Sequence, residues 1–88
     1  MSTEALLQTV IDYPMLITVL AQSDQNARYN MLFEYNAAFR ELIKRQDAKD
    51  VIAQQCQTMS GLDPNSATDE QIVKLGGLEM LYDLIDYQ

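Results

Sequence analysis

Residues 74–88 read KLGGLEMLYDLIDYQ, and this stretch decides which helical fold the sequence predicts. Two glycines, Gly76 and Gly77, stand before a strongly apolar segment. At helical spacing, four apolar side chains of that segment share one face: Leu78, Leu81, Tyr82 and Ile85. That face must be covered. We expect a closed bundle with this helix at its edge, and the alternative is half of a stacking repeat that needs a neighbour.

The opposite side of the same segment is acidic. Glu79, Asp83 and Asp86 follow at i, i+4 and i+7, although like charges four residues apart destabilise a helix by about 0.2–0.5 kcal/mol. The stripe is either a solvated face or a surface for a basic partner. The candidate partner-binding residues are therefore Glu79, Tyr82, Asp83, Asp86 and Tyr87, with Asp69 and Glu70 expected nearby.

A helix start precedes the glycine pair. Thr68 and Gln71 have the spacing of a capping box, with two acidic residues between them at the positive end of the helix. The pattern predicts a short helix over 69–75. We expect Gly76 and Gly77 to end it and to form a close-packed corner before the last helix.

The N-terminal half also has helical patterns. A helix capped by Ser2 or Thr3 is expected to stop at Tyr13, because Pro14 cannot continue it. A second helix over 14–22 is apolar nearly all round, so we expect it to be the central, buried element.

Two further helices follow before the loop at 63–70. One is predicted from about residue 24 to residue 45, with Tyr35 in its apolar stripe and a break near Asn36 left open. The next should be capped by Asp47 and end at Gly61, followed by a hydrophobe, which is the pattern of a Schellman motif. The sequence therefore predicts an all-α fold: a single domain over 1–88 built as a compact bundle of five to six short helices.

Tyrosines are the side chains best suited to a protein interface, because they combine a large apolar ring with a polar group. Of the five, Tyr13 and Tyr35 are expected in the core. Tyr87 and Tyr29 are better interface candidates.

Catalytic and metal-binding patterns are missing from the sequence. There is no histidine, and the single cysteine, Cys56, cannot form an intrachain disulfide or a zinc site. We interpret Cys56 as a small apolar residue of a helix face. A calcium loop beginning at Asp63 fails, because it has no glycine at the sixth position and has Lys74 where a bidentate Glu belongs. We expect no enzyme activity, no metal and no cofactor.

Charge restricts the class of partner. The formal net charge is −7, and residues 63–88 carry six acidic residues against one lysine, which leaves −5. Direct binding to nucleic acid or to an anionic membrane needs a basic surface, so neither is expected. A protein with a basic surface is the expected partner, and homo-oligomerisation is left open. With no secretory signal and no long apolar run, we expect a cytoplasmic protein.

Residues 36–62, NAAFRELIKRQDAKDVIAQQCQTMSGL, and residues 70–85, EQIVKLGGLEMLYDLI, resemble armadillo-type helical repeats. In that family a short helix ends in a glycine pair before the next apolar helix, as at Gly76 and Gly77. The resemblance implies armadillo-like, right-handed packing of helices. It carries over no ligand-binding residue.

Three functions fit these observations. The first is a small non-catalytic acidic protein that acts by protein–protein interaction, as an adaptor, subunit or assembly factor. The second is an acidic inhibitor, of the phage or immunity type, that blocks the basic site of a nucleic-acid-processing enzyme. The third is a structural subunit of a larger assembly.

Overall fold

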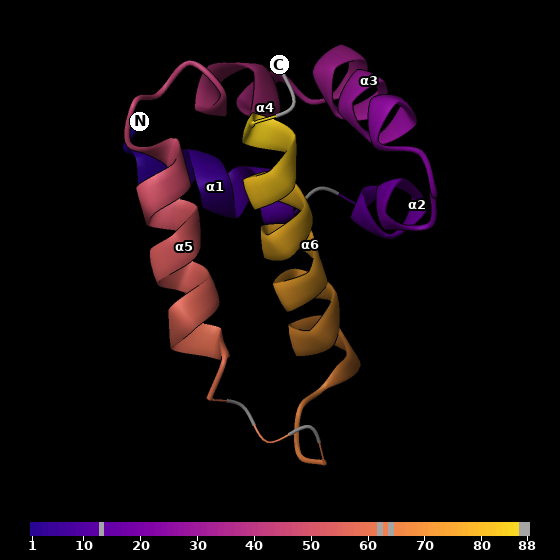
Figure 1. The fold of residues 1–88 in the computed structure, drawn as a ribbon, viewed down its shortest axis with the longest axis vertical. Coiled ribbons are helices and arrows are strands. Elements are labelled where there is room, and N and C mark those ends of the chain that lie inside the picture. Colours follow the sequence, from indigo (N-terminus) through magenta and orange to yellow (C-terminus); the bar gives the residue numbers. More distant parts are fainter. Residues whose placement is uncertain (13, 62, 64, 87–88) are drawn as a thin grey trace.

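The computed structural model describes residues 1–12, 14–61, 63 and 65–86, and the predictions made at Tyr13, Leu62 and Tyr87 lie outside these ranges. All regular structure in the described residues is α-helical, which confirms the predicted class. The helices are α1 (Thr3–Ile11), α2 (Leu16–Leu20), α3 (Gln25–Tyr35), α4 (Ala37–Leu42), α5 (Ala48–Met59) and α6 (Asp69–Ile85) (Figure 1).

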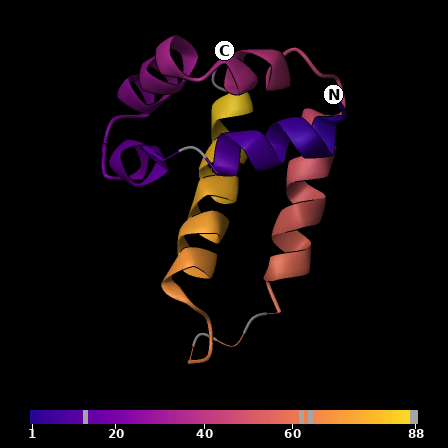
Figure 2. The ribbon, with the colours of Figure 1, turned by 180° about the vertical axis from the view of Figure 1, so that it is seen from behind.

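The long helices α5 and α6 form an antiparallel pair, joined by the loop at the far end of the molecule (Figure 1). Seen from behind, α1 crosses both of them (Figure 2). Helix α4 packs on α1 at the end where α6 finishes, while α2 and α3 flank α6 on the side away from α5. One face of the α5–α6 pair is thus covered by α1, and the other carries no helix of the described chain.

A single apolar core holds the six helices together. Each helix contributes at least one side chain with no exposed surface: Val10, Val19, Leu32, Phe39, Leu42, Ala48, Ile52, Leu81 and Leu84. Burying one such aliphatic side chain stabilises the fold by roughly 1.5–3 kcal/mol. The bundle is therefore closed over Leu78 and Leu81, which are buried, and Ile85 is partly buried against the same core. Tyr82, predicted on the same apolar face, is exposed and stays outside the core.

The glycine pair does not end a helix. Helix α6 is seventeen residues long and runs through Gly76 and Gly77 without a break. The predicted C-cap, the separate 69–75 helix and the break implied by the armadillo resemblance are therefore wrong. A Cβ added to Gly77 would lie 2.9 Å from Cδ2 of Leu16. Glycine is used here because α2 packs directly against the backbone of α6, not because the chain turns.

Helix α2 is shorter and less central than the sequence predicts. It begins at Leu16 rather than at Pro14, and only Leu16 and Val19 are buried. Ile17 is 65% exposed, and Tyr35, expected in the core, is 67% exposed at the end of α3. The chain bends at Asn36, so the side chain of Tyr35 leaves the stripe that one continuous helix would have formed.

Side-chain caps define most helix starts. Ser2 accepts a hydrogen bond from the Ala5 amide at 3.1 Å, and Asn36 accepts one from the Phe39 amide at 3.1 Å, which places the break at Asn36. Asp47 precedes α5 but does not cap it. Its carboxylate accepts a hydrogen bond from the Thr3 hydroxyl at 2.7 Å instead, and so links the starts of α1 and α5.

Gly61 follows α5 without the positive φ that the predicted Schellman motif requires. That prediction is wrong. Ser60, in right-handed helical conformation, ends α5 and donates its backbone amide to the Gln57 carbonyl.

Candidate functional site

A shallow hollow lies at the seam between α5 and α6. Ala53 and Cys56 of α5 and Glu79, Tyr82 and Asp83 of α6 line a shallow hollow of about 310 Å³. Three of the predicted partner-binding residues therefore lie together around one concave feature. We call this surface the α5–α6 face.

Helical spacing explains why these residues meet. In α6, positions 79, 82 and 83 fall on one side within little more than one turn, and in α5 positions 53 and 56 do the same. Ala53 has only a methyl group, so it leaves room beside the longer side chains of α6. The walls and floor are mainly apolar, while two carboxylates, of Glu79 and Asp83, stand at the rim.

Lys49 closes one end of the α5–α6 face. Its ammonium group bonds to the Asp86 carboxylate and lies 4.6 Å from the centre of the Tyr82 ring. The hydrogen bond with Asp86 raises the pKa of Lys49 above its ordinary value, and burial opposes this in part. Asp86, predicted as part of an open acidic stripe, is thus largely neutralised.

The surroundings of Cys56 disfavour ionisation of its thiol. Partial burial raises the pKa of its thiol above the ordinary value, and the nearby charge of Glu79 raises it further. The thiol is the reactive species only when it is ionised, so a raised pKa makes it less reactive at neutral pH. Cys56 packs against the core, in line with its interpretation as a small apolar residue.

Every lysine and arginine side chain is engaged within the described chain. The ion pairs are Lys44–Glu41, Lys49–Asp86 and Lys74–Glu70, and Arg28, Arg40 and Arg45 donate to backbone carbonyls. Glu79 and Asp83 have no cationic partner among the described residues. The acidic charge at the rim of the hollow is therefore uncompensated.

Asp69 and Glu70 lie elsewhere. They begin α6, where with Ile17, Val73 and Lys74 they line a second shallow hollow of about 250 Å³ between α2 and α6. At 1.5 Å per residue, the nine residues from Glu70 to the start of the acidic stripe span about 14 Å along the axis. The structure does not bring these two residues to the α5–α6 face, and the expectation that they lie beside the stripe is wrong.

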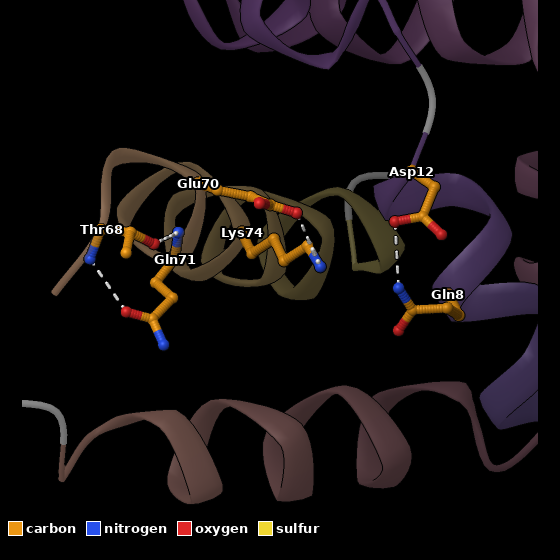
Figure 3. A network of polar contacts seen from close by, with 6 residues as sticks. All are labelled: Gln8, Asp12, Thr68, Glu70, Gln71 and Lys74. Atoms are coloured by element: carbon orange, nitrogen blue, oxygen red, sulfur yellow. Dashed lines mark hydrogen bonds and ion pairs between the residues drawn. The ribbon is translucent and has the colours of Figure 1, made fainter.

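Local contacts account for the acidic residues at the start of α6 (Figure 3). The Thr68 hydroxyl accepts a hydrogen bond from the Gln71 amide at 3.1 Å, and the Gln71 side chain accepts one from the Thr68 amide at 2.9 Å. This is the predicted capping box. One turn later the Lys74 ammonium lies 3.4 Å from the Glu70 carboxylate. On α1, Gln8 bonds to Asp12 in a similar exposed contact at 3.0 Å.

Sequence reasoning missed the residues that α5 contributes to the α5–α6 face. Lys49, Ala53 and Cys56 follow at i, i+4 and i+7, so a stripe could have been read from the sequence. Nothing local showed that this stripe faces the acidic side of α6, since that depends on how the two helices pair. Tyr29, an interface candidate, packs instead beside Phe33 and Phe39, with ring centroids 5.8 and 5.6 Å away.

The described residues contain no group of three or more His, Cys, Asp or Glu side chains placed to hold a metal ion. None of the helices in these ranges has the length and apolar character needed to cross a membrane.

Comparison of the chain with protein-family models, with curated proteins and with solved structures finds no match.

Proposed function

We propose that this chain is a non-catalytic acidic protein that acts by binding another protein through the α5–α6 face. A cytoplasmic location belongs to the same proposal. The observation that carries it is a concave, mainly apolar surface between α5 and α6, lined by two carboxylates that have no cationic partner among the described residues.

The residues around the hollow suit this role. Tyr82 is 38% exposed, and its ring is held by Lys49 on one side. Tyrosine is enriched among the residues that contribute most to binding, because it buries a large rigid ring with little loss of conformational entropy. A partner side chain that enters the hollow would cover this ring and remove apolar surface from water.

The experiment fills the hollow without changing its charge. Ala53→Leu replaces the methyl group of a lining residue with an isobutyl group and keeps a good helix former at an exposed position. Gln54→Leu is the matched control, since Gln54 is exposed on the same helix and does not line the hollow. Proteins retained from a lysate of the host on each variant are quantified by mass spectrometry.

We expect a partner that is retained by the unchanged protein and by Gln54→Leu and is lost with Ala53→Leu. Equal retention on all three proteins would show that the α5–α6 face is not the binding surface.

The acidic inhibitor is a second candidate, and the engagement of all six cationic side chains favours it. Every lysine and arginine side chain of the described residues already has a partner, while Glu79 and Asp83 stay available to the basic site of an enzyme. Under this function the affinity for the enzyme falls steeply as ionic strength rises, because exposed charges are screened. An affinity that is flat from low to high salt would exclude the inhibitor.

A further inference from the structure

The two ends of the α5–α6 face differ in charge. At the end nearest the C-terminus of α6, Lys49 neutralises Asp86 and covers one side of Tyr82. Along the rest of the rim, Glu79 and Asp83 are one helical turn apart and have no cation beside them among the described residues. A bound segment would therefore meet an ion pair at one end, negative charge along the rest, and an apolar lining beneath.

The volume of the hollow limits what can enter it. A closed apolar cavity of about 150 Å³ is large enough to bind benzene. The hollow of about 310 Å³ is open on one side, so it accommodates one large apolar side chain together with part of the backbone that carries it. It is too small and too shallow for a folded domain to enter.

The surroundings favour a helix as the bound segment. Two antiparallel helices present a groove that runs along their axes, and a third helix can lay its ridges into that groove at a small crossing angle. A peptide that binds by strand addition needs the edge of a sheet, and the described residues form no strand.

We infer that the α5–α6 face binds a basic amphipathic helix, with one large apolar side chain in the hollow between Ala53 and Tyr82. Lysine or arginine side chains one turn from that anchor contact Glu79 and Asp83. The residue that faces Lys49 is uncharged or acidic, which gives the bound helix one preferred direction. This inference rests on the proposed function and specifies the chemistry of the partner.

The test uses two synthetic helical peptides and the whole chain. Both peptides are alanine-based, carry one leucine anchor, and are stapled so that the helix is formed before binding, because short free helices are marginal in water. One has two lysines on the same side of the anchor, three and four residues from it, with alanine on the other side, and the other has glutamates in place of these lysines. Binding to the ¹⁵N-labelled protein is followed through amide chemical shifts.

We expect the lysine peptide to shift the amides around Ala53, Cys56 and Tyr82, and the glutamate peptide to leave them unchanged. The double change Glu79→Gln with Asp83→Gln should weaken the lysine peptide about three- to tenfold, in the range that two exposed ion pairs supply. Ala53→Leu should abolish these shifts, and Gln54→Leu should not.

Three results would overturn the inference. Equal binding of both peptides at the hollow would show that charge does not select the partner, while the proposed docking surface would stand. Shifts confined to the hollow between α2 and α6 would move the basic segment to another site. No shifts at millimolar lysine peptide would exclude a basic helix as the occupant. The proposed function is judged separately, by whether Ala53→Leu releases the protein captured from the host.

Discussion

The α5–α6 pair and the α2–α3 region are held in place by different means. Helices α5 and α6 have twelve and seventeen residues, and α6 alone buries Gly77, Leu78, Met80, Leu81 and Leu84. Helix α2 has only five residues, of which Leu16 and Val19 are buried. Helix α3 has eleven residues, and only Leu32 is buried. Apolar packing stabilises the first region, while little apolar surface is available to do so in the second.

In the α2–α3 region, hydrogen bonds from arginine side chains add to the limited apolar packing. Arg28 donates from Nε to the Gln22 carbonyl at 2.6 Å and from Nη2 to the Leu20 carbonyl at 3.0 Å. Arg40 donates to the Phe33 carbonyl at 2.6 Å, at the end of α3. The carbonyls of Leu20 and Phe33 lie in the last turns of α2 and α3, where a helix offers no internal partner, so the arginines satisfy groups that a C-terminal cap satisfies in other helices.

Because the two regions are stabilised differently, we expect mutations in them to cause different kinds of unfolding. Loss of a core side chain in the α5–α6 pair should unfold the whole molecule. Loss of an arginine should loosen α2 and α3 while the long helices stay formed, because regions with few buried contacts open at lower free energy.

The largest effect is expected for Leu81→Ala. Leu81 has no exposed surface, and removing a buried leucine side chain costs about 2–5 kcal/mol through lost burial and the cavity left behind. Urea denaturation followed by circular dichroism measures the loss. If this variant does not fold, Ile52→Val at another fully buried site of the pair should cost about 0.5–1.5 kcal/mol. Wild-type stability in both variants would contradict the importance of this seam.

Arg28→Ala comes next, with an expected cost of about 1.5–3 kcal/mol for two hydrogen bonds from a charged donor. Arg28→Lys should recover little of it, since an ammonium group lacks the planar fork that reaches both carbonyls. Hydrogen exchange should speed up at amides of α2 and α3 and stay slow in α5 and α6. Equal acceleration in all six helices would show that the two regions unfold as one unit.

The glycine pair offers a matched test of the contact between the two regions. A Cβ on Gly76 has Leu20 as its nearest neighbour at 4.0 Å, so Gly76→Ala should stabilise the protein by about 1 kcal/mol through helix propensity. Gly77→Ala gains the same propensity but presses on Leu16, and overpacking costs about 1–3 kcal/mol.

We therefore expect the melting temperature to rise for Gly76→Ala and to fall for Gly77→Ala. Equal increases for the two variants would mean that α2 moves aside freely, and that the close approach of α2 to α6 is not a constraint on the fold.

The smallest effect is expected for Lys49→Met, which keeps an unbranched apolar stem and removes the charge. The pKa of Lys49 is raised in the folded protein, so the stability it contributes is complete below its ordinary pKa of 10.5 and is lost as pH rises through the folded-state value. The difference in melting temperature between the two proteins should be constant near neutral pH and shrink above about pH 10.5. A difference that persists unchanged at pH 12 would assign the effect to packing on Tyr82.

Local signals in the sequence predicted the helical class, the starts at Ser2 and Thr68, and the burial of Leu78 and Leu81 on the last helix, but not the exposure of Tyr82. They succeed because a cap involves residues within one turn of each other, and because helical periodicity repeats every few residues. The clustering of Glu79, Tyr82 and Asp83 follows from the same periodicity.

Tertiary structure alone decided how α6 passes through Gly76 and Gly77 and which side chains complete the α5–α6 face. Glycine costs a helix about 1 kcal/mol per residue, a penalty smaller than the stabilisation gained when the segments on both sides are packed. The sequence shows that local cost but not the packing of Leu16 against Gly77 that offsets it. In the same way, Lys49, Ala53 and Cys56 join the acidic side of α6 only because the two helices pair in this register, and pairing between distant segments leaves no local pattern.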